Sequence, residues 1–186
     1  MNIGFAMCGS FCTFSKVLPI MESLAQKHTV IPILSEASRC IDSRFGTAQE
    51  HFDRISSICG TAPICTIAQA EPIGPKKLLD ALVIAPCTGN TLAKLAHSIA
   101  DGPVTMAAKS HLRNGRPILV AISTNDALAG GAENIGRLLN KRHYYFVPFR
   151  QDDPIQKPTS IVADFQRLPD ALEAALEGRQ LQPLLL

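Results

Sequence analysis

Residues 83–96 read VIAPCTGNTLAKLA, and this stretch indicates the fold of the chain. An apolar run ends at Pro86, small polar residues follow at once, and a helical pattern begins at Thr91. This order is typical of a buried parallel strand whose carboxyl end leads into a helix and presents side chains to a ligand. We therefore expect segment 86–91 to form one wall of a binding site.

The composition is that of a folded domain rather than of a disordered or fibrous chain. Hydrophobic residues make up 46% of the 186 residues, which is enough to bury a sizeable core. The formal net charge of +2 lacks the strong basic excess of nucleic-acid-binding proteins. No apolar run approaches the ~20 residues that cross a bilayer, and the N-terminal residues show no secretory signal. We expect a cytoplasmic location, with neither nucleic acid nor membrane as a partner.

Six cysteines are present, but their spacing favours no metal centre. No two of them form a Cys-x-x-Cys pair, the arrangement typical of zinc and thioredoxin-like sites. We interpret them as reduced thiols and expect no bound metal. The cysteines are Cys8, Cys12, Cys40, Cys59, Cys65 and Cys87.

Apolar stretches alternate with helical patterns along the chain. Strands are expected at 2–8, 29–34, 63–67, 82–85, 116–123 and 144–149, and helices at 14–27, 42–59, 91–100, 104–112, 126–140 and 168–177. Polar segment 150–158, with two prolines, is expected to be a surface loop. Continuously apolar strands between helices predict a parallel sheet covered on both faces, so we expect a three-layer, doubly wound, Rossmann-like α/β fold. One domain should span 1–178, followed by a loosely held C-terminal tail at 179–186.

Four of the expected strands end in small polar residues, and these ends should share one edge of a parallel sheet. Ligands of such folds bind at this edge, so the coincidence predicts a binding site more strongly than any single motif. The candidate residues are Gly9, Ser10 and Phe11 after the first strand; Ser35 after the second; Pro86, Cys87, Thr88, Asn90 and Thr91 after the fourth; and Ser123, Thr124 and Asn125 after the fifth.

The turn after the first strand suits a phosphate group. Gly9 allows close approach of the backbone, Ser10 offers a hydroxyl, and the following helix presents free N–H groups. The turn matches neither the Gly-x-Gly-x-x-Gly dinucleotide motif nor a Walker P-loop. An alternative interpretation is a helix cap in a tight turn, and the same alternative applies to Thr91 after the fourth strand.

Segment 86–91 resembles the Pro-Ala-Ser-Ala-Asn-Thr element of the FMN-binding flavoproteins, a family that includes phosphopantothenoylcysteine decarboxylases and flavin prenyltransferases. Further runs at 70–80, 105–109, 111–114, 123–126 and 149–154 are similar to the dipicolinate synthase B subunits of spore-forming bacteria. The resemblance spans nearly the whole chain. It implies a flavoprotein-type fold and an FMN cofactor, with Gly9, Ser10 and Ser35 at its phosphate.

The same resemblance implies a function as well as a fold. It implies an oligomeric oxidoreductase that forms dipicolinate, pyridine-2,6-dicarboxylate, from a dihydrodipicolinate-type precursor in the mother cell during sporulation. It also implies a partner, an A subunit of the NAD(P)-binding type. Aromatising the ring removes two electrons, which a flavin can accept. The catalytic residues are unknown, and the candidates for holding the substrate carboxylates are Lys109, Arg113 and Arg44, with Lys76 and Arg150 as further cations.

Two other functions stay open from the sequence. The chain could be a non-catalytic structural subunit that completes its partner's active site. It could also be a stand-alone FMN-dependent decarboxylase or prenyltransferase. Against the decarboxylase, segment 122–126 lacks the Pro-x-Met-Asn-x-x-Met-Trp element of that branch, and the chain contains no Trp.

Overall fold

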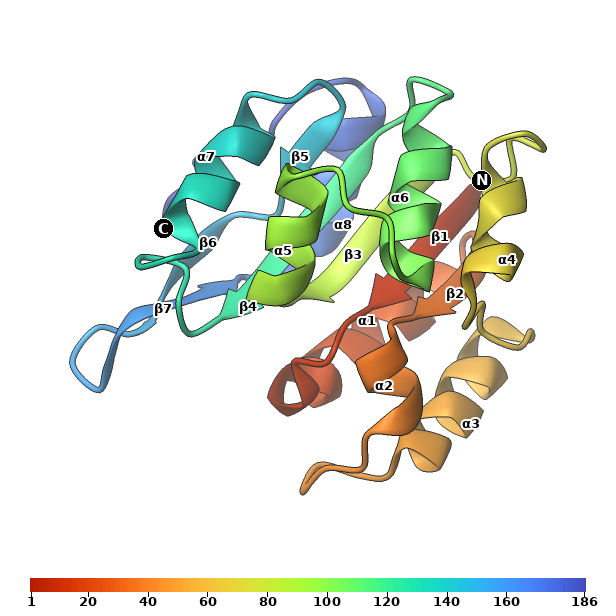
Figure 1. The fold of residues 1–186 in the computed structure, drawn as a ribbon, viewed down its shortest axis with the longest axis horizontal. Helices are drawn as coiled ribbons and strands as arrows, with labels where there is room; N and C mark the ends of the chain where they lie inside the picture. The colour runs from red at the N-terminus through yellow and green to blue at the C-terminus, as the bar shows by residue number, and fades with distance from the viewer.

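A seven-stranded sheet runs through the centre of the computed structural model, which describes residues 1–186 (Figure 1). Five strands are parallel, as the sequence predicts, and their order is β2-β1-β3-β4 with β5 beside β4. The parallel strands are β1 (Asn2–Met7), β2 (Thr29–Leu34), β3 (Ala81–Cys87), β4 (Ile118–Thr124) and β5 (Tyr144–Phe146).

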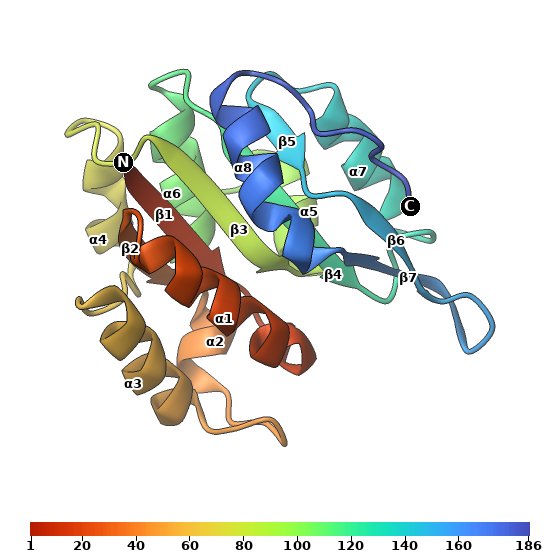
Figure 2. The ribbon, with the colours of Figure 1, turned by 180° about the vertical axis from the view of Figure 1, so that it is seen from behind.

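An antiparallel hairpin continues the sheet beyond the carboxyl end of β4. It consists of β6 (Phe149–Asp153) and β7 (Lys157–Ala163), and β7 pairs with β4 through Ser123 and Thr124. Figure 2 shows the hairpin projecting from the body of the molecule. The expected surface loop at 150–158 is therefore wrong, because its polar residues form a solvent-facing strand pair and Pro154 lies in the connecting turn.

Helices cover both faces of the sheet, which confirms the three-layer fold (Figures 1 and 2). One layer contains α4 (Ile67–Ala70), α5 (Gly89–Ala96), α6 (Pro103–Leu112) and α7 (Ala132–Leu139), and the other contains α1 (Phe14–Ala25), α3 (Ala48–Cys59) and α8 (Leu168–Leu176). The short helix α2 (Glu36–Cys40) follows β2 at the carboxyl edge of the sheet. Single 3-10 turns lie at Phe11–Thr13, Glu71–Ile73 and Phe165–Arg167.

Two apolar cores fill the space between the sheet and the two helix layers. Successive residues of β3 alternate between them: Leu82 and Ile84 face the α5–α6 side, whereas Val83 and Ala85 face the α1–α8 side. Because both faces are buried, the strand needs an unbroken apolar sequence. Burying one such large aliphatic side chain stabilises the fold by roughly 1.5–3 kcal/mol, so the central strands hold the site residues at their ends rigidly.

Several expected elements differ from those of the structure. The helix expected at 42–59 begins only at Ala48, where Thr47 is the N-cap, and the strand expected at 144–149 is divided between β5 and β6. At 63–67 there is only one bridge, between Ile64 and Ile33, and Thr66 instead caps the short helix α4. The helix expected at 126–140 begins at Ala132, because the Asp126 carbonyl accepts hydrogen bonds from Ala129 and Gly131 and closes a turn first.

The C-terminal residues lie against the sheet instead of being loosely held. The Gln180 side chain accepts a hydrogen bond from the Phe146 N–H at 2.8 Å and donates one to the Phe146 carbonyl at 2.7 Å. The Leu186 N–H donates to the Phe149 carbonyl. None of the helices has the length and apolar character that crossing a membrane would require.

Candidate cofactor and ligand site

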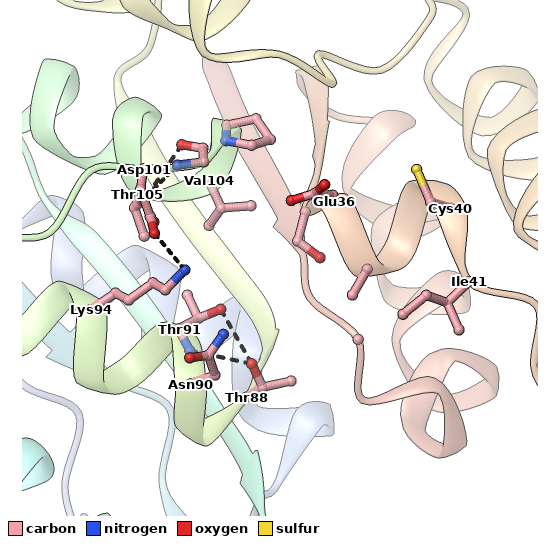
Figure 3. A pocket seen from close by; sticks show the side chains of 15 residues that line it. Glu36, Cys40, Ile41, Thr88, Asn90, Thr91, Lys94, Asp101, Val104 and Thr105 are labelled. Atoms are coloured by element: carbon pink, nitrogen blue, oxygen red, sulfur yellow. Dashed lines mark hydrogen bonds and ion pairs between the residues drawn. The ribbon is translucent and has the colours of Figure 1, made fainter.

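A cavity of about 600 Å³, the principal cavity, opens at the carboxyl edge of the sheet (Figure 3). Gly9 contributes from the turn after β1 and Ser35 from the end of β2. Figure 3 shows α2 with Glu36 and Cys40 on one side and α5 with Thr88 and Asn90 on the other. The start of α6, at Gly102–Thr105, closes a further side. The expected meeting of the strand ends is thus present, and it brings polar groups of distant segments into one hollow.

A second cavity of about 420 Å³ adjoins the principal one and is lined without a single hydrophobic side chain. Both cavities share Gly9, Thr88 and Asn90, so they meet where β1 and β3 end. The second cavity extends to the end of β4 at Ser123 and Thr124. Together the two cavities form a groove along the edge of the sheet. Nine of the twelve cofactor-binding candidates line it: Gly9, Ser10, Ser35, Thr88, Asn90, Thr91, Ser123, Thr124 and Asn125.

Hydroxyl groups position the helix starts that face this groove. Thr88, and not Thr91, is the N-cap of α5: its side chain accepts a hydrogen bond from the Thr91 N–H and donates one to the Thr91 hydroxyl. Ser35 caps α2 by accepting from the Ser38 N–H at 3.2 Å. Because the first N–H groups of a helix have no partner within the helix, the starts of α5 and α6 favour a negatively charged ligand in the groove.

A chain of polar contacts joins the end of β4 to its neighbours. The Ser10 and Ser123 hydroxyls lie 2.8 Å apart, and the Thr124 hydroxyl donates to Asp126 at 2.6 Å. Gly89 packs directly on the latter pair: a Cβ atom there would lie 2.7 Å from both Thr124 Oγ1 and Asp126 Oδ1. Only glycine therefore lets the start of α5 approach β4 this closely.

Pro86 and Cys87 support the groove from inside and do not line it. Both are buried, and the Pro86 carbonyl accepts a hydrogen bond from the Cys8 N–H. Burial raises the pKa of the Cys8 thiol to about 11 and raises that of Cys87 well above its ordinary value. Both cysteines are therefore neutral thiols at physiological pH, and Cys87 packs in the protein interior instead of facing the groove. All six cysteines are free.

The principal cavity contains one ion pair that the sequence did not indicate. Lys94 Nζ lies 2.9 Å from Asp101 Oδ2, with the Asp101 carboxylate at the start of α6 (Figure 3). The Lys94 contact lowers the pKa of Asp101. Glu36 also lines this cavity and has no ion-pair partner. In the sequence, segment 101–103 indicates only the end of a helix. The fold brings Asp101 and the start of α6 to the wall of the principal cavity.

The hairpin adds a third cavity, of about 370 Å³, beside Ser10 and Ser123. Its far wall carries the Lys157–Asp152 ion pair, 2.7 Å long, and Ser160. Sequence reasoning missed Asp152 and Lys157 because they lie on strands that it took for a loop.

The remaining candidates lie outside the groove. Lys109 lines another cavity between α5 and α6, Arg113 is the C-cap of α6, and Arg44 stacks on the Phe45 ring at 4.8 Å. Phe11 packs at 5.4 Å from the Phe14 ring, beside His51 in a small separate cavity. The exposed cations Lys76 and Arg150 also lie outside the groove, Arg150 on β6. Binding of substrate carboxylates by these cations stays a prediction.

Comparison with known proteins places this geometry in a family. The family model described as Flavoprotein matches residues 1–164. The chain belongs to the flavoprotein family. This agrees with the resemblance of segment 86–91 and with the groove at the carboxyl edge of the sheet.

Two relatives resemble the chain over nearly its whole length. The B subunit of dipicolinate synthase from Bacillus subtilis strain 168 is 44% identical over 185 residues, which cover 99% of this chain and 92% of that protein. The crystal structure of the dipicolinate synthase B subunit from Bacillus halodurans is 45% identical, with a TM-score of 0.91, and the match covers 100% of this chain and 95% of the other. The FMN-dependent cysteine decarboxylase SpaF shares the fold at 23% identity and a TM-score of 0.71, with 95% of each chain covered.

Proposed function

We propose that this chain is the flavin-binding subunit of a dipicolinate synthase. With FMN in the groove and an A subunit of the NAD(P)-binding type as partner, it would form dipicolinate from a dihydrodipicolinate-type precursor in sporulating cells. Identity of 44% and 45% to two B subunits over nearly the full chain supports this proposal. The observation that carries the cofactor assignment is the convergence of four polar strand ends on one groove.

The residues of the groove fit FMN in size and chemistry. A phosphate needs N–H and hydroxyl donors, and the Gly9 turn, Ser35, Thr88 and the start of α5 supply them. A flavin ring needs apolar contacts, which Ile41 and Val104 offer in the principal cavity. Cavities of about 600 and 420 Å³ lie within the range that encloses small cofactors.

Bound FMN would supply a two-electron acceptor for the aromatisation of a dihydropyridine ring. The chain's own residues would hold the reactants and exclude water. Glu36 is the one carboxylate of the principal cavity without an ion-pair partner, because Asp101 binds Lys94. Glu36 is therefore our candidate for taking up a proton released from the ring, and Asn90 and Ser10 are candidates for orienting the cofactor.

The visible absorption spectrum of the chain copurified with its partner tests this proposal. We expect a yellow complex whose flavin band bleaches when the dihydro precursor is added without oxygen, since the flavin then accepts the electrons. A flavin-loaded complex that forms dipicolinate without bleaching in a single turnover would move the redox step to the partner. A colourless complex with full activity would show that this chain has only a structural role.

A further inference from the structure

A cavity of about 390 Å³, the Tyr144 cavity, lies between α5, α6 and the start of β5, away from the cofactor groove's strand ends. Its floor is apolar and includes Leu95, Ala108 and Leu112. Ile99 also lines the cavity and is 48% exposed, so the apolar surface continues toward solvent. Such a floor suits the flat face of a small ring.

The charged groups around this floor are cationic, and none is acidic. Lys109, Lys141 and Arg142 line the cavity, and no Asp or Glu does. Lys141 donates to the Leu95 and Ala96 carbonyls at the end of α5. Lys109 and Arg142 form no ion pair, so their charges are free for a ligand. The principal cavity differs in this respect, because its single cation, Lys94, is paired with Asp101 and leaves no free positive charge for a ligand.

Tyr144 provides a further polar group at this cavity. The residue is only 8% exposed and lines the cavity, and its hydroxyl makes no hydrogen bond to another protein group. Burial raises the pKa of Tyr144 to about 12, so the phenol keeps its proton at physiological pH. This hydroxyl is free to donate to a ligand in the cavity, and a carboxylate oxygen would accept its hydrogen bond.

Thr105 connects this cavity with the cofactor groove. Thr105 lies in the first turn of α6 and lines both the Tyr144 cavity and the principal cavity. The Thr105 hydroxyl is hydrogen-bonded to both backbone groups of Gly102, which fixes it in the wall. A ligand in the Tyr144 cavity would therefore be next to the groove and separated from it by one side chain.

We infer that the Tyr144 cavity binds a small ring that carries two carboxylates, with the ring on the apolar floor and the carboxylates at Lys109 and Arg142. This inference rests on the proposed function, which makes such a dicarboxylate the product, and the Tyr144 cavity would hold it beside the groove in which FMN and Glu36 would act on the ring. It assigns the dicarboxylate to a position beside the cofactor groove. One cation of the sequence-based set, Lys109, belongs to this site, and Arg142 replaces Arg113 and Arg44 as its companion.

Calorimetric titration with pyridine-2,6-dicarboxylate tests this assignment on the purified chain. The double variant K109Q/R142Q should bind the dicarboxylate roughly tenfold more weakly or worse, since it loses two charged contacts. Y144F should weaken binding less, and K27Q/K77Q, which removes two exposed charges outside every site described, should bind like wild type. Thermal melting and FMN uptake, followed by absorbance, should be unchanged in every variant.

Equal binding by wild type and K109Q/R142Q would overturn the assignment and leave the proposed function intact. A wild-type chain that takes up FMN but gives no dicarboxylate binding would overturn it as well. A wild-type chain that takes up no FMN would instead overturn the proposed function. Pyridine-2-carboxylate, with one carboxylate, should bind about tenfold more weakly than the dicarboxylate if both cations are used.

Discussion

The hydroxyl oxygens of Ser10 and Ser123 lie 2.8 Å apart and join the turn after β1 to the end of β4. β3 lies between these two strands in the sheet, so the contact bridges the mouth of the groove beside Thr88 and Asn90. Residues 113 positions apart in sequence thus fix the width of the site. Both residues line the second cavity, so a ligand there would lie beside this bridge.

A double-mutant cycle measures the Ser10–Ser123 bridge. We expect S10A and S123A each to lower stability by about 1 kcal/mol and to couple by a similar amount, because both remove the same hydrogen bond. Urea unfolding gives these values, and FMN affinity should fall in both variants. S56A removes a hydroxyl that donates to Phe52 in α3, so it should leave FMN affinity unchanged. Additive effects of S10A and S123A would contradict the bridge.

Replacing Gly89 by alanine should separate α5 from β4. The new Cβ would lie 2.7 Å from Thr124 Oγ1 and Asp126 Oδ1, so one of them must move. We expect a loss of about 1–3 kcal/mol in unfolding free energy and weaker FMN binding. Gly136→Ala is the matched control: it lies in α7 with nothing within 4 Å of its Cβ, and it should gain about 0.5–1 kcal/mol. Similar effects at both glycines would contradict the close approach.

The cap of α5 predicts a difference between two substitutions of one residue. Thr88→Ala removes the acceptor for the Thr91 N–H and should cost about 1 kcal/mol of stability. Thr88→Ser keeps the hydroxyl and should restore most of it. Chemical unfolding of both variants is the measurement. Equal losses would show that the threonine methyl group, and not the cap, stabilises this turn.

Acid should destabilise the fold through His111. Burial lowers the pKa of His111 to about 4, against a weaker opposing effect of the hydrogen bond from its Nε2 to the Pro117 carbonyl, 3.0 Å long. Between pH 6.5 and 4 the unfolded chain therefore binds more protons than the folded one. Stability is complete above pH 6.5 and falls as the pH drops through this window, by about 3 kcal/mol in all.

Urea unfolding from about pH 7 to about pH 4 checks this loss. His111→Gln should flatten the pH dependence, and the smaller pKa depression of buried His51 should leave a remaining slope of the same sign. His28→Gln, at a half-exposed position, should keep the slope of the wild type. A slope unaffected by His111→Gln would show that other groups control acid unfolding.

The strand ends were predictable because they follow from local patterns. Apolar runs that stop at Gly9, Ser35, Thr88 and Ser123 specify buried parallel strands, and a parallel sheet brings their carboxyl ends to one edge. The sequence also predicts the layers, since each helix carries one apolar face. Most residues that line the groove could therefore be predicted from the sequence alone.

Features set by distant contacts were not predictable in this way. The β6–β7 hairpin has a polar sequence with two prolines and is held by pairing of β7 with Ser123 and Thr124. Asp101 becomes a site residue only through Lys94, one helix earlier. Arg142 lies near Lys109 only because β5 returns beside β4. Each of these features depends on how distant segments of the chain are brought together, which local sequence patterns do not specify.

Asn90 provides the most direct test of the central claim, that the groove binds FMN. It lines both cavities, its side chain is exposed, and it makes no hydrogen bond to the protein. Titration of FMN into the flavin-free chain, followed by flavin fluorescence, should show one FMN per wild-type chain. Asn90→Ala should bind about tenfold more weakly at unchanged melting temperature. A wild-type chain that binds no FMN, or an Asn90→Ala chain that binds it as tightly as wild type, would contradict the account.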